Sequence, residues 1–133
     1  MLKNLGSKAG VAAAAAVMAV MGLAGTANAQ PGVGYIGYHQ ANNPHAVWCV
    51  QHMYNYFVTV NDPGAHPTIA EDGVFGPATD DAIRFVQKQW YPSEVDGIVG
   101  PATGDMLLVE GDPYYGTFAG GKGYCYSYIP SFN

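Results

Sequence analysis

Two aspartates in repeated surroundings are the first residues of this chain to consider for chemistry. Asp72 and Asp96 each stand directly before a glycine. A pair of carboxylates suffices for glycoside hydrolysis, in which one group acts as general acid and the other as nucleophile or base. An aspartate before glycine in a turn, however, commonly accepts hydrogen bonds from nearby backbone amides. The sequence therefore predicts a structural role for both carboxylates and no catalytic residue.

The histidines and cysteines do not form a metal-binding or nucleophile pattern. His45 and His52 are seven residues apart, whereas zinc ligands on one helix favour i,i+4 spacing and need a third partner. Cys49 beside His52 would be reactive only as a free thiol. We therefore expect no metal, no cofactor and no enzymatic activity. The histidines interpreted as packing or solvent-facing residues are His39, His45, His52 and His66.

The aromatic residues are better candidates for binding. The chain has 10 Tyr, 5 Phe and 2 Trp, and all of them follow residue 29. Sugar rings pack their C–H faces on flat aromatic side chains, with polar groups at the rim. Trp90, Tyr91 and the tyrosines of the C-terminal tail could form such a surface, although we expect most of the aromatic residues to be core.

The first 29 residues have the three-part pattern of a secretory signal peptide. Lys3 and Lys8 precede an alanine-rich apolar run, and Ala27-Asn28-Ala29 is a small-x-small cleavage site. An uncleaved membrane anchor is the alternative. Cleavage after Ala29 would leave 104 residues with a net charge of −7, which argues against nucleic acid and anionic membranes as partners. We expect a secreted, extracellular protein.

Cys49 and Cys125 are the two cysteines, and in an oxidising compartment one disulfide between them is expected. Two free thiols are the alternative. The disulfide would close a loop that spans 125 − 49 = 76 positions. Closing a loop of this size stabilises the fold by about 4 kcal/mol at most in a chain-entropy treatment.

Three helices must position these residues. Asn43 and Pro44 have the types preferred at the cap and first position of a helix, predicted to end near Phe57. A second helix is predicted from Pro77 to Gln89 or Trp90, and a third from Pro101 to about Val109. We expect residues 30–43 to form an extended arm. Residues 111–133 are a Tyr- and Gly-rich tail, expected to cover the face of the first helix that carries Cys49.

An internal repeat precedes the second and third helices. Residues 72–79 read DGVFGPAT and residues 96–103 read DGIVGPAT. In each copy we expect the glycines to supply positive φ and proline to open a helix. The structural residues of the two copies are Asp72, Gly73, Gly76, Pro77, Asp96, Gly97, Gly100 and Pro101.

With these phrases in view, the chain resembles the peptidoglycan-binding domain found beside many bacterial cell-wall hydrolases. Val47, Val50 and Gln51 match the phrase of its first helix, both Asp-Gly phrases match, and Val86-Gln87 stands where the family has Phe-Gln. The resemblance covers about residues 47–108. It implies a mainly α fold, a small three-helix bundle over residues 44–110, here with a disulfide-stapled aromatic tail.

The resemblance also implies a function, and with it a protein that is extracellular or cell-wall associated. We expect a monomeric, non-catalytic module that docks on peptidoglycan glycan or stem peptide, with ligand contacts from Gln87, Trp90 and Tyr91. One alternative is a protein-interaction module that targets or restrains a cell-wall enzyme. A second is a small cell-wall hydrolase with an unrecognised site.

Overall fold

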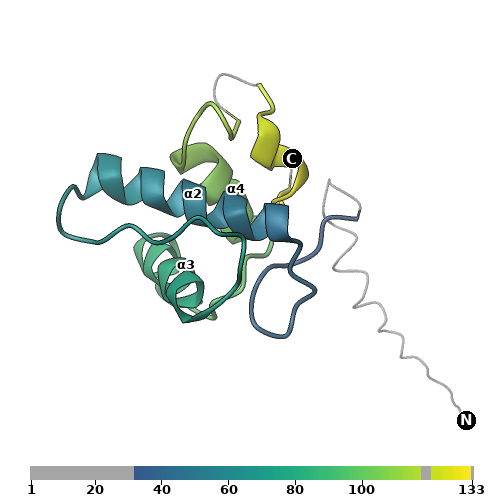
Figure 1. Ribbon diagram of the computed structural model, residues 1–133, viewed down its shortest axis with the longest axis horizontal. Coiled ribbons are helices and arrows are strands. Elements are labelled where there is room, and N and C mark those ends of the chain that lie inside the picture. The colour runs from purple at the N-terminus through teal and green to yellow at the C-terminus, as the bar shows by residue number, and fades with distance from the viewer. Residues whose placement is uncertain (1–31, 118–120, 133) are drawn as a thin grey trace, which may run out of the picture.

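A computed structural model describes residues 32–117 and 121–132, so the predicted signal peptide lies outside the described residues, as do Phe118 and Gly120 of the tail. Three α-helices and one short 3-10 helix make up the fold, and no strand occurs in the described ranges (Figure 1). The prediction of a small, mainly α three-helix bundle is confirmed. None of the helices in these ranges combines the length and apolar character needed to cross a membrane.

Helix α2 (Pro44–Asn61) begins as predicted. The Asn43 side chain accepts a hydrogen bond from the His45 amide at 2.8 Å, and Pro44 occupies the first turn. The helix is four residues longer than predicted, because Val58 is buried and its carbonyl accepts a bond from the amide of Asp62, which closes the last turn. The buried stripe therefore runs almost the full length of α2.

Helices α3 (Pro77–Trp90) and α4 (Pro101–Glu110) each begin at the Gly-Pro step of a repeated phrase. The capping residues Gly76 and Gly100 have extended backbone and φ of −146° and −101°. The expectation of positive φ at these two glycines was wrong. Positive φ occurs instead at Gly73 (71°) and Gly97 (75°), where the chain turns ahead of the helix and where side chains other than glycine are strained.

Helix α2 is the centre of the bundle and packs on both α3 and α4 (Figure 1). A single apolar core joins the three helices, with further residues from the loops. Its fully buried members of largest volume are Ile36, Val47, Val50, Met53, Val58, Ile83, Val86, Leu107, Leu108 and Ile129. Burial of these side chains is the main stabilising contribution, at about 1.5–3 kcal/mol each before the entropy of ordering is subtracted.

The segments outside the helices are fastened to the bundle. In the arm, Ile36 pairs with Val99 in an antiparallel bridge, with N···O distances of 3.2 and 2.8 Å. In the tail, the Cys125 amide donates to the Tyr115 carbonyl at 2.9 Å. The 3-10 helix η3 (Tyr124–Ser127) carries Cys125, which forms the predicted disulfide with Cys49.

Candidate functional site

A buried glutamine of α2 holds the first repeated turn. The Gln51 side chain is 1% exposed. Its amide nitrogen donates to the Asp72 carboxylate at 3.0 Å, the Val74 carbonyl at 3.2 Å and the Thr79 hydroxyl at 3.0 Å. Its oxygen accepts from the Gly73 amide at 2.9 Å. One side chain thus fixes both ends of the turn.

Gln87 of α3 holds the second turn in the same way. It is 2% exposed, and its nitrogen donates to the Asp96 carboxylate at 2.9 Å, the Ile98 carbonyl at 2.9 Å and the Thr103 hydroxyl at 3.1 Å. Its oxygen accepts from the Asp96 and Gly97 amides at 3.1 and 2.9 Å. Each turn is therefore anchored by a glutamine from the helix that precedes it.

Both aspartates form turns and do not cap the helices, which have no side-chain cap. Asp72 Oδ1 accepts from the Val74 amide at 3.0 Å, and Asp96 Oδ1 accepts from the Ile98 amide at 2.9 Å. The Val74 amide, with a further contribution from Gln51, lowers the pKa of Asp72 from its usual value. The Asp72 carboxylate therefore stays ionised and acts as an acceptor, which does not fit a general acid.

A shallow pocket lies beside each repeated turn. The pocket at the second turn has a volume of about 200 Å³, and the pocket at the first about 160 Å³. The smaller is lined by Gln51, Ala70, Asp72, Val74, Gly76, Pro77, Ala78 and Thr79. The larger is lined by Gln87, Glu94, Asp96, Ile98, Gly100, Pro101, Ala102 and Thr103, and in addition by Tyr91 and Phe132.

The two pockets are copies of one site. Seven residues of the smaller pocket have their counterpart 24 positions later in the larger one, and Gln51 corresponds to Gln87 in its bonding. The larger pocket differs from the smaller one in having two additional aromatic residues, Tyr91 and Phe132, and in having Glu94 at the position of Ala70. The repeat therefore produces a duplicated surface feature as well as a duplicated turn.

The arm brings the two turns next to each other. The Tyr38 ring packs edge-on against Phe75 of the first phrase, with centroids 5.1 Å apart. Three residues earlier, Tyr35 lies over Gly100 of the second phrase, where an added Cβ would be 3.4 Å from the ring. An added Cβ on Gly97 of the second phrase would also collide with the side chain of Asp80, which directly follows the first phrase, so the two phrases border one another.

The structure separates the three residues predicted to contact a ligand. Gln87 and Tyr91 both line the larger pocket, but the Gln87 amide is already fully bonded inside the protein. The Trp90 ring packs on Phe57 instead, with centroids 5.3 Å apart and planes at 79°, and belongs to the edge of the core. Of the three, Tyr91 has the position that suits ligand contact.

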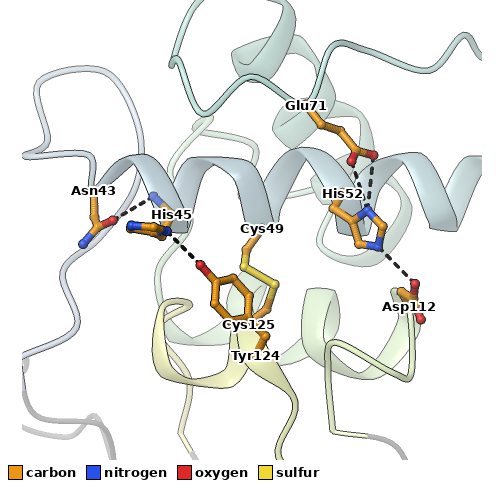
Figure 2. The surroundings of a disulfide bond; sticks show 8 residues. All are labelled: Asn43, His45, Cys49, His52, Glu71, Asp112, Tyr124 and Cys125. Atoms are coloured by element: carbon orange, nitrogen blue, oxygen red, sulfur yellow. Dashed lines mark hydrogen bonds and ion pairs between the residues drawn. A yellow bond between two sulfur atoms is a disulfide. The ribbon is translucent and has the colours of Figure 1, made fainter.

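A second group of polar and aromatic residues surrounds the disulfide (Figure 2). The two ring nitrogens of His52 lie 3.1 Å from a carboxylate oxygen of Glu71 and 3.0 Å from one of Asp112, and the ring stacks on Trp48 with centroids 4.8 Å apart. Because Asp112 follows α4 and Glu71 precedes the first turn, this histidine ties both segments to α2. No group of His, Cys, Asp and Glu in the described ranges is arranged to hold a metal ion.

Tyr124 contributes a further link from the tail to α2 in the same view. Its hydroxyl lies 2.7 Å from His45 Nδ1 (Figure 2). Partial burial raises the pKa of Tyr124, and a hydrogen bond with Tyr128 adds to the increase. The hydroxyl is therefore neutral at physiological pH and available for hydrogen bonding.

Comparison with known families agrees with the geometry of the turns. Residues 54–107 match the model of the family described as putative peptidoglycan binding domain. The match takes in both repeated phrases, α3 and most of α4, and leaves out Gln51, the arm, the disulfide and the tail. No curated protein and no solved structure matches the chain.

The resemblance pointed to Gln51 and Gln87, but no sequence pattern showed that these two residues anchor the turns. Gln51 and Gln87 are 36 residues apart, whereas the phrases are 24 apart, so the repeat alone does not pair each glutamine with its turn. The available signal was a glutamine within the apolar stripe of each preceding helix, a polar residue that must find partners when buried.

Proposed function

We propose that this chain, which is similar over residues 54–107 to peptidoglycan-binding domains, is a secreted and non-catalytic module that docks on peptidoglycan. The family match supports cell-wall binding in general. The observation that carries the specific proposal is the duplicated pocket, because a polymer of repeating units offers equivalent groups to two equivalent sites.

The larger pocket is the main contact in this proposal. Tyr91 and Phe132 supply aromatic walls for the C–H face of a sugar or an apolar side chain, and Phe132 is 51% exposed. Glu94 and Asp96 supply acceptors for hydroxyl or amino groups. This combination suits glycan or stem peptide. The buried Gln87 side chain holds the turn in place and does not contact the ligand.

The smaller pocket adds a weaker contact of the same kind. Two linked contacts on one polymer strengthen each other, because the second becomes intramolecular once the first has formed. The proposal therefore expects tight retention on the intact polymer and weak binding of single repeat units.

Secretion is part of the proposal and rests on two features. The first 29 residues have the signal-peptide pattern, and the Cys49–Cys125 disulfide is of the kind that persists in oxidising compartments. Cell fractionation is expected to recover the protein in the medium or in the wall fraction. N-terminal sequencing of the recovered protein is expected to begin at Gln30.

Co-sedimentation with purified sacculi tests the proposal. The protein is expected in the pellet with sacculi and in the supernatant with cellulose, an insoluble polysaccharide without stem peptides. Equal retention on both, or on neither, contradicts it. Release of soluble fragments from the sacculi during incubation would instead support the hydrolase alternative.

A protein-interaction module is the second candidate function. Tyr114 is 79% exposed and Tyr124 is 45% exposed on the tail, and aromatic residues of this kind are enriched at protein interfaces. Retention of a cell-wall enzyme on the immobilised chain, abolished by replacing these tyrosines and not by blocking the turn pockets, would favour this candidate.

A further inference from the structure

A third cavity shares no lining residue with the two turn pockets. It has a volume of about 510 Å³, more than twice that of either turn pocket and within the range of small-molecule sites. Its walls come from residues 32–36 of the arm, from Asn42, Asn43 and Ala46 at the start of α2, and from Ser127 and Tyr128 of the tail. All of them lie outside the residues that match the family.

The walls of this arm–tail cleft are held in place by independent contacts. Asn42 accepts from the Gly37 amide at 2.9 Å and donates to its carbonyl at 2.8 Å, which closes the loop of the arm. The tail side is tied to α2 by the disulfide, and the Tyr128 ring stacks on His45 with centroids 5.2 Å apart and planes at 24°. The cleft is therefore a formed site between fastened segments.

The lining is uncharged and combines apolar residues with a few polar ones. It includes no Asp, Glu, Lys or Arg, although the chain is acidic overall. An anionic or cationic ligand would lack a counter-charge in the cleft, whereas a neutral ligand with many hydroxyl or amide groups would not need one.

The available hydrogen-bonding groups fit such a ligand. Among the described residues, the Asn43 side chain uses only its oxygen, in the cap of α2, which leaves its nitrogen free to donate. The Ser127 hydroxyl is exposed at the edge of the cleft and can donate and accept. The Tyr35 side chain, 40% exposed, lines the cleft and offers its ring, whereas the Tyr128 ring is stacked on His45.

We propose that the arm–tail cleft is a second binding site, for a neutral saccharide of a few rings. The saccharide packs against the Tyr35 ring and hydrogen-bonds to Asn43 and Ser127. The site uses neither turn pocket, so it does not rest on the proposed function and each can fail without the other.

The test is an NMR titration of the ¹⁵N-labelled, oxidised protein with a β-1,4-linked N-acetylglucosamine tetramer. Saturable shifts are expected at the amides of Asn43, Ser127 and Tyr128. Ser127→Trp places an indole in the cleft and is expected to weaken binding at least about tenfold, a change of about 1.4 kcal/mol. Thr59→Trp adds the same ring on an exposed turn of α2, about 20 Å further along the helix, and should leave binding unchanged.

Three results overturn the proposal. One is the absence of saturable shifts at millimolar saccharide. Another is a set of shifts confined to Tyr91, Phe132 and the turn pockets, which would support the proposed function alone. The third is unchanged binding by Ser127→Trp in a folded protein. Ser127→Arg serves as a second cleft-filling variant if Ser127→Trp does not fold.

Discussion

The amide nitrogen of Gln87 donates to the carboxylate of Asp96 at 2.9 Å and so joins α3 to the turn that opens α4. Gln51 and Asp72 repeat this relationship at 3.0 Å between α2 and the turn that opens α3. Each helix thus specifies where the next one begins. The stability of the bundle and the shape of the two pockets depend on the same two side chains.

Replacing either glutamine by glutamate should lower the stability of the folded protein. Gln87→Glu keeps the size of the side chain but sets a second carboxylate against Asp96 and the Ile98 carbonyl, both of which lose the donor that Gln87 supplied. We expect a loss of at least about 2 kcal/mol in the free energy of unfolding at neutral pH. Denaturant unfolding measures it. Gln89→Glu, exposed on the same helix, is the matched control, and a Gln87→Glu value within about 0.5 kcal/mol of that control would contradict the account.

The pH dependence of stability should report Asp72. Its pKa is lowered in the folded protein by the Val74 amide and by Gln51, so its contribution is present above the unfolded value of 3.8 and is lost as pH falls through the lower folded value. Asp72→Asn does not titrate. The difference in unfolding free energy between wild type and Asp72→Asn should therefore decrease below about pH 4. A difference that is constant from neutral pH into this acidic range would refute the assignment.

Gly104 marks the place where the two repeats must differ. It follows the second phrase, where the first has Asp80, and an added Cβ would collide with the Pro130 carbonyl of the tail. We expect Gly104→Ala to destabilise the protein by about 1–3 kcal/mol or more through overpacking. Gly34→Ala, where a Cβ meets nothing within 4 Å, should have a much smaller effect. Thermal unfolding of the two variants checks this, and equal melting temperatures would show that the tail does not pack on α4 as described.

The disulfide should be complete in the oxidised protein and should hold the tail. Intact-mass measurement after thiol labelling is expected to show no label without reductant and two labels after reduction in denaturant. Replacing both cysteines by serine should lower the free energy of unfolding by up to about 4 kcal/mol. Faster hydrogen exchange is expected first around Cys125 and Tyr115. Labelling of the native protein without reductant would contradict the pairing.

The helix starts were predictable because they depend on local chemistry. Asn43 and the prolines at the first helical positions act on their own turn, without information from the rest of the fold. The end of α2 was not predictable in the same way. Thr59 and Val60 are β-branched, and only the packing of Val58 on the core extends the helix past them.

The site was harder to predict because its parts come from different segments. Trp90 and Tyr91 are neighbours in sequence, but α3 ends between them, so one ring packs on Phe57 and the other lines a pocket. The turns are also contacted by residues distant in sequence, namely Tyr35 and Tyr38 of the arm and Phe132 of the tail. No spacing in the sequence reports these contacts.

Retention on sacculi by three alanine-to-tryptophan variants tests the central claim most directly. Ala78→Trp and Ala102→Trp fill the smaller and the larger pocket, and Ala65→Trp adds the same ring to an exposed loop. Each pocket variant should lower the fraction of protein bound to sacculi, and Ala102→Trp should lower it more than Ala78→Trp. The double variant should be lost from the pellet. The control Ala65→Trp should bind like wild type. Retention of the folded double variant at the wild-type level would show that the repeated turns are not the surface that binds the wall.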